Sequence, residues 1–93
     1  MSRRTPLKLR LYIAGDAPNS TQARANLAAL CRSHPCQIEV IDVFRNPKRA
    51  LADGIFMTPT LVKCSPSPVR RIVGTLGHAQ TVWQALGLED LAA

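Results

Sequence analysis

The sequence predicts an α/β domain whose elements follow the order βαβαββα. A strand–helix–strand unit opens the chain, because residues 7–13 alternate apolar and polar side chains and residues 38–44 form a second β-rich run. Residues 61–63 and 69–73 are two further β-rich runs, separated by a loop of prolines and serines. Residues 79–86 carry apolar side chains at helical spacing and close the pattern.

The first strand is followed by residues 15–20, a cluster of turn and helix-cap residues. We expect Asn19 or Ser20 to cap a helix that continues to about Arg32. Residues 38–44 contain few polar side chains, which is typical of a strand near the interior of a sheet. A strand, a helix and a strand of these lengths predict parallel pairing between the two strands.

The second half of the chain starts with a short helix. It is expected to begin at Pro47 and to end at Gly54, since proline suits a first helical turn and glycine suits the residue after a helix. Thr58 and Pro59 then open the third strand. A proline disturbs a strand least at its start, and we expect the peptide bond before Pro59 to be cis.

Composition limits the classes of protein that fit. The chain has 93 residues, 46% hydrophobic and 19% charged, which predicts one folded domain over residues 1–93 with residues 1–6 as a disordered N-terminal segment. No apolar run approaches the ~20 residues of a membrane helix, and Lys8 and Arg10 argue against a signal peptide. We therefore expect a cytoplasmic protein without a membrane partner.

The formal net charge of +6 favours an acidic partner. With one Trp, one Tyr and two Phe, and no densely basic helix face, the chain is not expected to bind nucleic acid. A basic nucleic-acid adaptor stays as a minority hypothesis.

Three cysteines, Cys31, Cys36 and Cys64, form no CxxC motif and are interpreted as reduced, partly buried thiols. His34 has no second ligand at metal spacing, so we interpret it as a solvated loop residue. We expect no metal, no cofactor and no catalytic residue.

Lys63, Arg70 and Arg71 are the candidate partner-binding residues. Arg70 and Arg71 alternate across a strand, so at least one of them points away from the core. Two interpretations stay open: charge that protects an edge strand, or a surface for an acidic partner. Lys63 is taken as a surface charge.

The element order and the Thr58–Pro59 step resemble the thioredoxin-like fold. In redox members of that fold, the turn that corresponds to residues 17–20 carries CxxC, and here it reads APNS. A thiol oxidoreductase needs a low-pKa thiolate at this helix start, and these residues supply none. A thioredoxin-fold redox or glutathione-linked enzyme without CxxC is the alternative hypothesis.

Several blocks of the sequence also resemble the KaiB family of circadian clock proteins over residues 7–88. They are LYIAG at 11–15, PNS at 18–20, EVIDV at 39–43, NP at 46–47, TPTL at 58–61, Pro66, and PVRRIVG at 68–74. The resemblance implies a non-enzymatic regulator that docks on the KaiC-like ring ATPase and modulates circadian or stress-related timing. A KaiA-like protein or a sensor kinase would be a further partner, and the chain would form a dimer or tetramer.

The resemblance also implies fold switching. Family members have a ground-state fold with a rearranged C-terminal half, which is the alternative to the thioredoxin-like fold here. Gly74 and Thr75 fall in the segment that switches, and the family usually has aspartate at the position of Thr75. Gly54 and Gln22 replace a usual lysine and arginine. These differences indicate a divergent, non-cyanobacterial member that rests mainly in the thioredoxin-like state.

Overall fold

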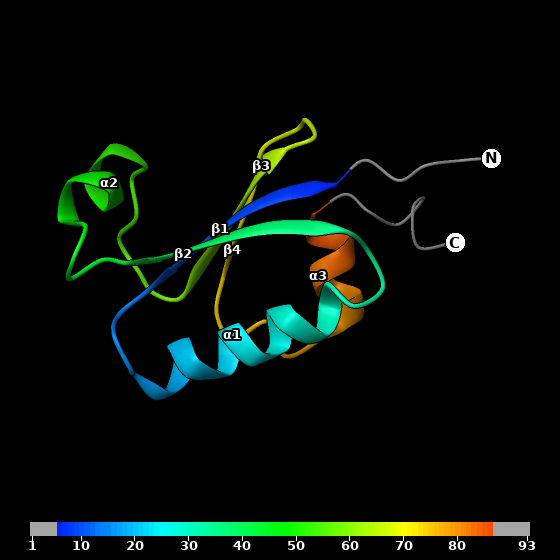
Figure 1. The fold of residues 1–93 in the computed structure, drawn as a ribbon, viewed down its shortest axis with the longest axis horizontal. Coiled ribbons are helices and arrows are strands. Elements are labelled where there is room, and N and C mark those ends of the chain that lie inside the picture. Colours follow the sequence, from blue (N-terminus) through cyan, green and yellow to red (C-terminus); the bar gives the residue numbers. More distant parts are fainter. Residues whose placement is uncertain (1–5, 87–93) are drawn as a thin grey trace.

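A computed structural model describes residues 6–86, and it has the predicted order of elements (Figure 1). Of the segment expected to be disordered, residues 1–5 lie outside the described part of the chain. The elements are β1 (Leu7–Ile13), α1 (Pro18–Leu30), β2 (Cys36–Asp42), α2 (Pro47–Ala52), β3 (Thr60–Ser65), β4 (Arg70–Val73) and α3 (Ala79–Ala85). The prediction of an α/β fold with this order is confirmed.

The four strands form one mixed sheet in the order β2-β1-β3-β4. β1 pairs in parallel with β2, as predicted, while β3 pairs antiparallel with β1 and with β4. The expectation that β2 lies near the sheet interior is wrong, because β3 takes the other side of β1 and leaves β2 at an edge. Ile38 and Val40 are accordingly 40 and 42% exposed.

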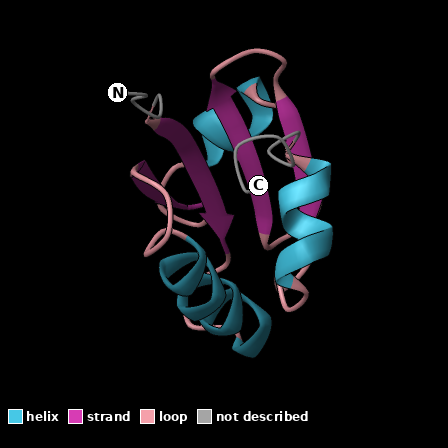
Figure 2. Ribbon diagram, turned by 90° about the vertical axis from the view of Figure 1, so that its right-hand side faces the viewer, coloured by secondary structure: helices cyan, strands magenta, loops and turns pink. Residues whose placement is uncertain are grey.

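The two faces of the sheet are covered differently. α1 and α3 lie against one face (Figure 2), where alternate residues of β1 point into the main core. α2 packs against one end of the opposite face, where Ala50 joins a second, smaller cluster. The main core comprises Leu7, Leu9, Leu11, Ile13, Ala23, Leu27, Leu61, Leu76, Val82 and Leu86; the second comprises Tyr12, Ile41, Ala50 and Val62.

The start of α1 differs from the expected cap. Its N-cap position is Ala17, which makes no side-chain cap, and Pro18 occupies the first turn. The buried hydroxyl of Ser20 instead accepts a 3.1 Å hydrogen bond from the backbone N–H of Ala14. Neither Asn19 nor Ser20 therefore caps the helix. The hydroxyl of Ser20 is bonded to the loop that precedes α1.

The end of α2 agrees with the prediction. Gly54 adopts φ = +67°, a left-handed conformation that glycine accepts readily. The N–H of Gly54 donates to the carbonyl of Leu51 at 3.1 Å, and the N–H of Ile55 donates to that of Ala50 at 2.9 Å. This pair of bonds is a Schellman motif, so the glycine terminates the helix as the sequence indicated.

β2 begins and ends two residues earlier than expected. At its start, the carbonyl of Pro35 already accepts the N–H of Leu7 at 2.9 Å. At its end, the carboxylate of Asp42 accepts the N–H of Phe44 at 2.9 Å and that of Gly15 at 3.3 Å. The aspartate thus starts a turn at a position where the apolar pattern continues.

Two expectations about side chains between α1 and β2 are wrong. Cys31 and Cys36 are joined as a disulfide, with Cα atoms 5.8 Å apart, rather than both being reduced thiols. The turn after α1 brings them into the usual range for such a bond. Cys64 is a free thiol, as expected. His34 is buried in this turn rather than solvated, with 2% of its surface exposed.

Candidate partner-binding surface

The predicted site residues on β4 lie at the edge of the sheet, but they do not form one cluster. Pairing places Arg70 opposite Lys63 and Arg71 opposite Val62. The two arginines therefore point to opposite faces of the sheet, and both are exposed. Arg71 lies on the α2 face, where its Nη1 donates to the carbonyl of Gly54 at 3.3 Å.

Lys63 is not a surface charge. Only 2% of the residue is exposed, and its Nζ donates a 2.6 Å hydrogen bond to the carbonyl of Leu86, which follows α3. Burial lowers the pKa of Lys63, and the nearby positive charge of Arg70 lowers it further. Lys63 links the last helix to the sheet.

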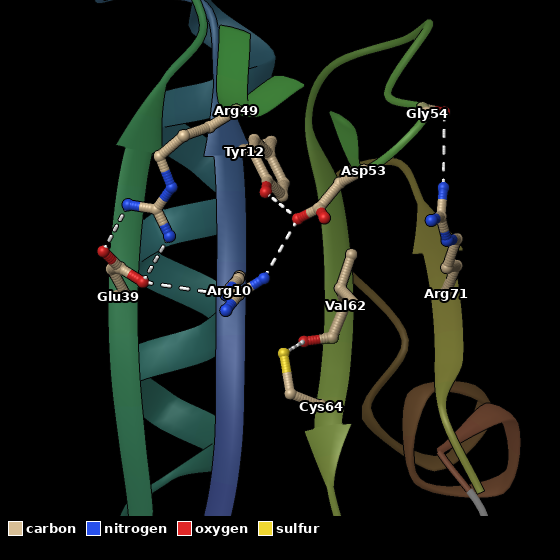
Figure 3. Close-up of polar contacts among 9 residues, drawn as sticks. All are labelled: Arg10, Tyr12, Glu39, Arg49, Asp53, Gly54, Val62, Cys64 and Arg71. Atoms are coloured by element: carbon tan, nitrogen blue, oxygen red, sulfur yellow. Dashed lines mark hydrogen bonds and ion pairs between the residues drawn. The ribbon is translucent and has the colours of Figure 1, made fainter. Parts of the chain in front are cut away.

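A polar network occupies the α2 face of the sheet, centred on Asp53 at the end of α2 (Figure 3). Its carboxylate accepts hydrogen bonds from the hydroxyl of Tyr12 and from Nη1 of Arg10, the latter at 3.1 Å. These bonds lower the pKa of Asp53, the one from Tyr12 most strongly. The pKa of Tyr12 is raised, first by burial and then by donation to Asp53. The network ties α2 to the central strand β1.

Glu39 on the edge strand β2 extends this network (Figure 3). Arg49 of α2 donates to both carboxylate oxygens of Glu39, at 2.6 and 2.9 Å. Nε of Arg10 lies 3.7 Å from Oε1 of Glu39. The hydrogen bonds from Arg49 lower the pKa of Glu39. The α2 face of the sheet thus presents carboxylate and guanidinium groups in fixed positions. The two hydrogen bonds from Arg49 to Glu39 also fix how these two side chains are oriented.

Large apolar side chains are exposed around α2, and our sequence analysis did not identify them as a site. Phe56 is 90% exposed and Phe44 is 74% exposed, with Leu51 and Met57 close to them in sequence. They lie in α2 and its flanking loops at one end of the molecule (Figure 1). Phe56 and Met57 precede the third strand without belonging to a period of two, and that irregularity was the available sequence signal.

The predicted fold-switch segment joins β4 to α3. Gly74 adopts φ = +122°, and the buried Leu76 adopts φ = +63°, which is uncommon for a large side chain. The carbonyl of Thr75, between them, accepts a 2.6 Å hydrogen bond from Nδ2 of Asn26 on α1. Gly74 also donates its N–H to the carbonyl of Pro59 at 2.9 Å. The segment is held from α1 and from the entry to β3.

The peptide bond between Thr58 and Pro59 is cis, the isomer expected from the sequence. Two further bonds, Ser65–Pro66 and Ser67–Pro68, are also cis and lie in the β3–β4 loop. Pro59 is buried beside the first residue of β3. It lies where the sequence placed it, at the mouth of the third strand.

No three His, Cys, Asp or Glu side chains within residues 6–86 lie close enough together to hold a metal ion. The turn at residues 17–20 carries no thiol, and the disulfide lies at the other end of α1. None of the described helices is long and apolar enough to cross a membrane. Fold and sequence together define a thioredoxin-like domain with no cysteine in the turn that begins α1.

Comparison with known proteins identifies the family. The KaiB domain model matches residues 10–88. A circadian clock oscillator protein KaiB of Prochlorococcus marinus is 43% identical over 91 residues, covering 95% of this chain and 76% of that protein. The circadian clock protein KaiB3 of Synechocystis sp. is 40% identical over 84 residues, covering 87% and 80%. The chain belongs to the KaiB family of non-enzymatic circadian clock proteins, as the sequence motifs indicated.

Solved structures agree with the fold. The N-terminal domain of SasA from Synechococcus elongatus matches with a TM-score of 0.66 and 26% identity, covering 97% of this chain and 91% of that domain. A chloroplastic thioredoxin z matches with a TM-score of 0.74 and 22% identity, covering 94% and 81%. The second likeness concerns the fold alone, and the thioredoxin-like class is confirmed.

Proposed function

We propose that this chain is a regulatory binding protein that docks on a KaiC-like ring ATPase and modulates circadian or stress-related timing. Membership of the KaiB family over residues 10–88 is the observation that carries the proposal. The likeness to the N-terminal domain of SasA supports it, since a second clock protein presents the same fold. A KaiA-like protein or a sensor kinase is a further partner under this proposal, in the cytoplasm.

The surface around α2 and β4 suits such a partner. Arg71 lies on the α2 face of the edge strand β4, and the exposed ring of Phe56 offers an apolar anchor at the α2 end. Arg70 lies on the opposite face of the same strand. Aromatic and arginine side chains contribute most often to the few dominant contacts of an interface. The formal net charge of +6 favours approach to an acidic surface. Lys63, buried under Leu86, acts only by holding the fold.

The direct test is the affinity of this chain for a purified KaiC-type ATPase, measured at low and high salt. Steering charges are screened over about 8–10 Å, so affinity should fall as salt is added. Arg70→Glu and Arg71→Glu should each weaken binding by roughly tenfold. Arg32→Glu, an exposed charge reversal beyond the end of α1, is the matched control and should bind like the native protein.

The apolar contribution has its own test. Phe56→Ala should weaken binding without lowering the melting temperature, because its ring is 90% exposed. Failure to bind any KaiC-type ATPase would refute the proposed function. Unchanged affinity in Arg70→Glu and Arg71→Glu would leave the arginines as edge protection only.

We further propose that Gly74 and Thr75 form the hinge of a fold switch. The positive φ of Gly74 and the uncommon φ of Leu76 place two special backbone conformations in one short connection. Its only described side-chain hydrogen bond is the one from Asn26 to the Thr75 carbonyl. Small changes there can shift the balance between two folds that differ by a few kcal/mol. The alternative fold would be seen as a dimer or tetramer by light scattering.

A further inference from the structure

We propose that the Cys31–Cys36 disulfide is a reversible redox site that a dithiol reductant opens and that thereby changes the packing of α3. This inference is independent of the proposed docking on an ATPase. The two cysteines lie at the opposite end of α1 from residues 17–20, which correspond to the CxxC turn of the redox proteins. They would be a substrate of thiol exchange rather than a catalyst of it.

The first argument is access. Cys31 follows the last residue of α1, Cys36 is the first residue of β2, and both are partly exposed. A reductant can therefore reach the bond without unfolding of the domain. Cys64, the third cysteine, lies on the other face of the sheet with the Tyr12 cluster. Exchange within the chain does not involve it.

The second argument is that hydrogen bonds hold this corner without the disulfide. The N–H of Cys31 donates to the carbonyl of Leu27 at 3.0 Å, and the N–H of Ser33 donates to that of Leu30 at 3.4 Å. The carbonyl of Pro35 accepts the N–H of Leu7 at 2.9 Å. The turn between the cysteines keeps its backbone bonds when the sulfurs separate, so both redox states are compatible with one fold.

The third argument links the bond to α3. The two sulfurs line an apolar contact with Leu30 of α1 and with Val82 and Leu86 at the other helix, and the remaining cavity is only ≈ 10 Å³. Opening the bond places two separate thiols where one disulfide was packed. Val82 and Leu86 line the same contact, so reduction changes what these two side chains pack against.

The exchange itself balances with one dithiol. A thiolate of the reductant attacks Sγ of Cys31, forming a mixed disulfide, and Cys36 leaves as a thiolate that takes a proton from water. Cys36 leaves first because a thiolate on Cys31 would lie at the negative end of the α1 dipole. The second thiolate of the reductant then attacks the mixed disulfide, and Cys31 leaves and is protonated. The protein gains two electrons and two protons, and the dithiol becomes a disulfide.

The experiment uses the full chain with Cys64→Ser, so that only the pair can react. The oxidised protein is equilibrated in buffers of increasing dithiothreitol reducing power and alkylated, and the modified cysteines are counted by mass spectrometry. Cys31 and Cys36 should become reactive together in one two-electron transition. A parallel arm with a thioredoxin at equal dithiol concentration distinguishes a protein dithiol, by its faster rate, from a small one.

Two readouts report the consequence. Reduction should lower the melting temperature by roughly 10 °C. The disulfide closes a short loop in the unfolded chain, and breaking it raises the conformational entropy of the unfolded state. Methyl NMR signals of Val82 and Leu86 should move on reduction, while those of Val62 on the other face should not. The variant Cys31→Ser, made with Cys64→Ser, should reproduce the reduced state without any reductant.

Three outcomes would overturn the proposal. Cys31 and Cys36 would both be alkylated before any reductant is added, which would show that the bond does not form. Alternatively, the reduced chain would lose its circular dichroism spectrum, so that the bond would be a requirement for folding. Finally, the Val82 and Leu86 signals would stay in place through the full transition, which would disconnect the bond from α3.

Discussion

Replacing Lys63 by methionine tests how α3 is held on the sheet. Methionine keeps an unbranched stem of similar length and removes the ammonium group, so the carbonyl of Leu86 loses its 2.6 Å donor in a buried contact. A buried carbonyl left without a partner costs about 1–3 kcal/mol. The opposing effect is relief from burying a charge, which the lowered pKa of Lys63 reflects.

We expect the cost of the unpaired Leu86 carbonyl to exceed the gain from no longer burying a charge. Lys63 donates to the carbonyl at the end of α3, where the helix dipole also favours a positive charge. The free energy of unfolding at neutral pH should fall by about 1–2 kcal/mol, which for a domain of this size lowers the melting temperature by roughly 5–15 °C.

Urea unfolding followed by circular dichroism measures the change, with Lys8→Met as the matched control. Lys8 is exposed on β1, so its loss should alter stability by less than about 0.5 kcal/mol. Hydrogen exchange adds a local readout, since the N–H of Leu86 donates to the carbonyl of Val82 and should exchange faster in Lys63→Met. A variant as stable as the native protein, or more stable, would refute the reasoning.

The pH dependence gives a second check on Lys63. Its pKa in the folded protein lies below the ordinary value of 10.5, so between these two values the unfolded chain binds more protons than the folded one. Stability contributed by this group therefore rises with pH across that interval. The free energy of unfolding of the native protein, relative to that of Lys63→Met, should therefore increase as pH rises toward 10.5. The other titrating groups are shared by the two proteins, so their contributions cancel in this comparison.

Three further predictions concern the opposite face and the connection to α3. Asp53→Asn should lose about 1 kcal/mol, because the carboxylate accepts the hydroxyl of Tyr12; since the pKa of Asp53 is lowered, this difference should be present above pH 3.8 and vanish as pH falls through the folded-state pKa. Gly54→Ala should lose about 1 kcal/mol in urea unfolding, because φ there is +67°. Thr75→Asp should shift the population roughly tenfold toward the alternative fold, seen by NMR as helix signals over residues 63–70, and no shift would place the pivot elsewhere.

The fold was largely predictable because its signals are local. Alternation along β1, the turn residues after it, and Gly54 after α2 each act through neighbours in the chain. Strand order was harder, since the apolar run of β2 suits an interior strand equally well. Its edge position follows from β3 pairing on the other side of β1, which is a tertiary choice.

The candidate surface was less predictable for the same reason. Lys63 reads as a surface residue in sequence, and only the packing of α3 over β3 shows that it is buried. Cys31 and Cys36 lack a familiar spacing, and the turn between helix and strand brings them together. Asp53 lies far in sequence from Tyr12, and its carboxylate accepts a hydrogen bond from the hydroxyl of Tyr12. Contacts of this kind depend on the assembled fold.

The start of α1 differs from that of the redox proteins with this fold. In a redox protein the free amides and dipole of this helix start stabilise a thiolate. In this chain Ala17 and Pro18 begin the helix, and the hydroxyl of Ser20 is engaged by the N–H of Ala14. The positions that would carry chemistry have become structural. Cys31, one of the two bonded cysteines, follows the last residue of α1, where the helix dipole disfavours a thiolate. The chain exposes an edge strand with two arginines and apolar side chains around α2, and under the proposed function these are the groups that contact the partner protein.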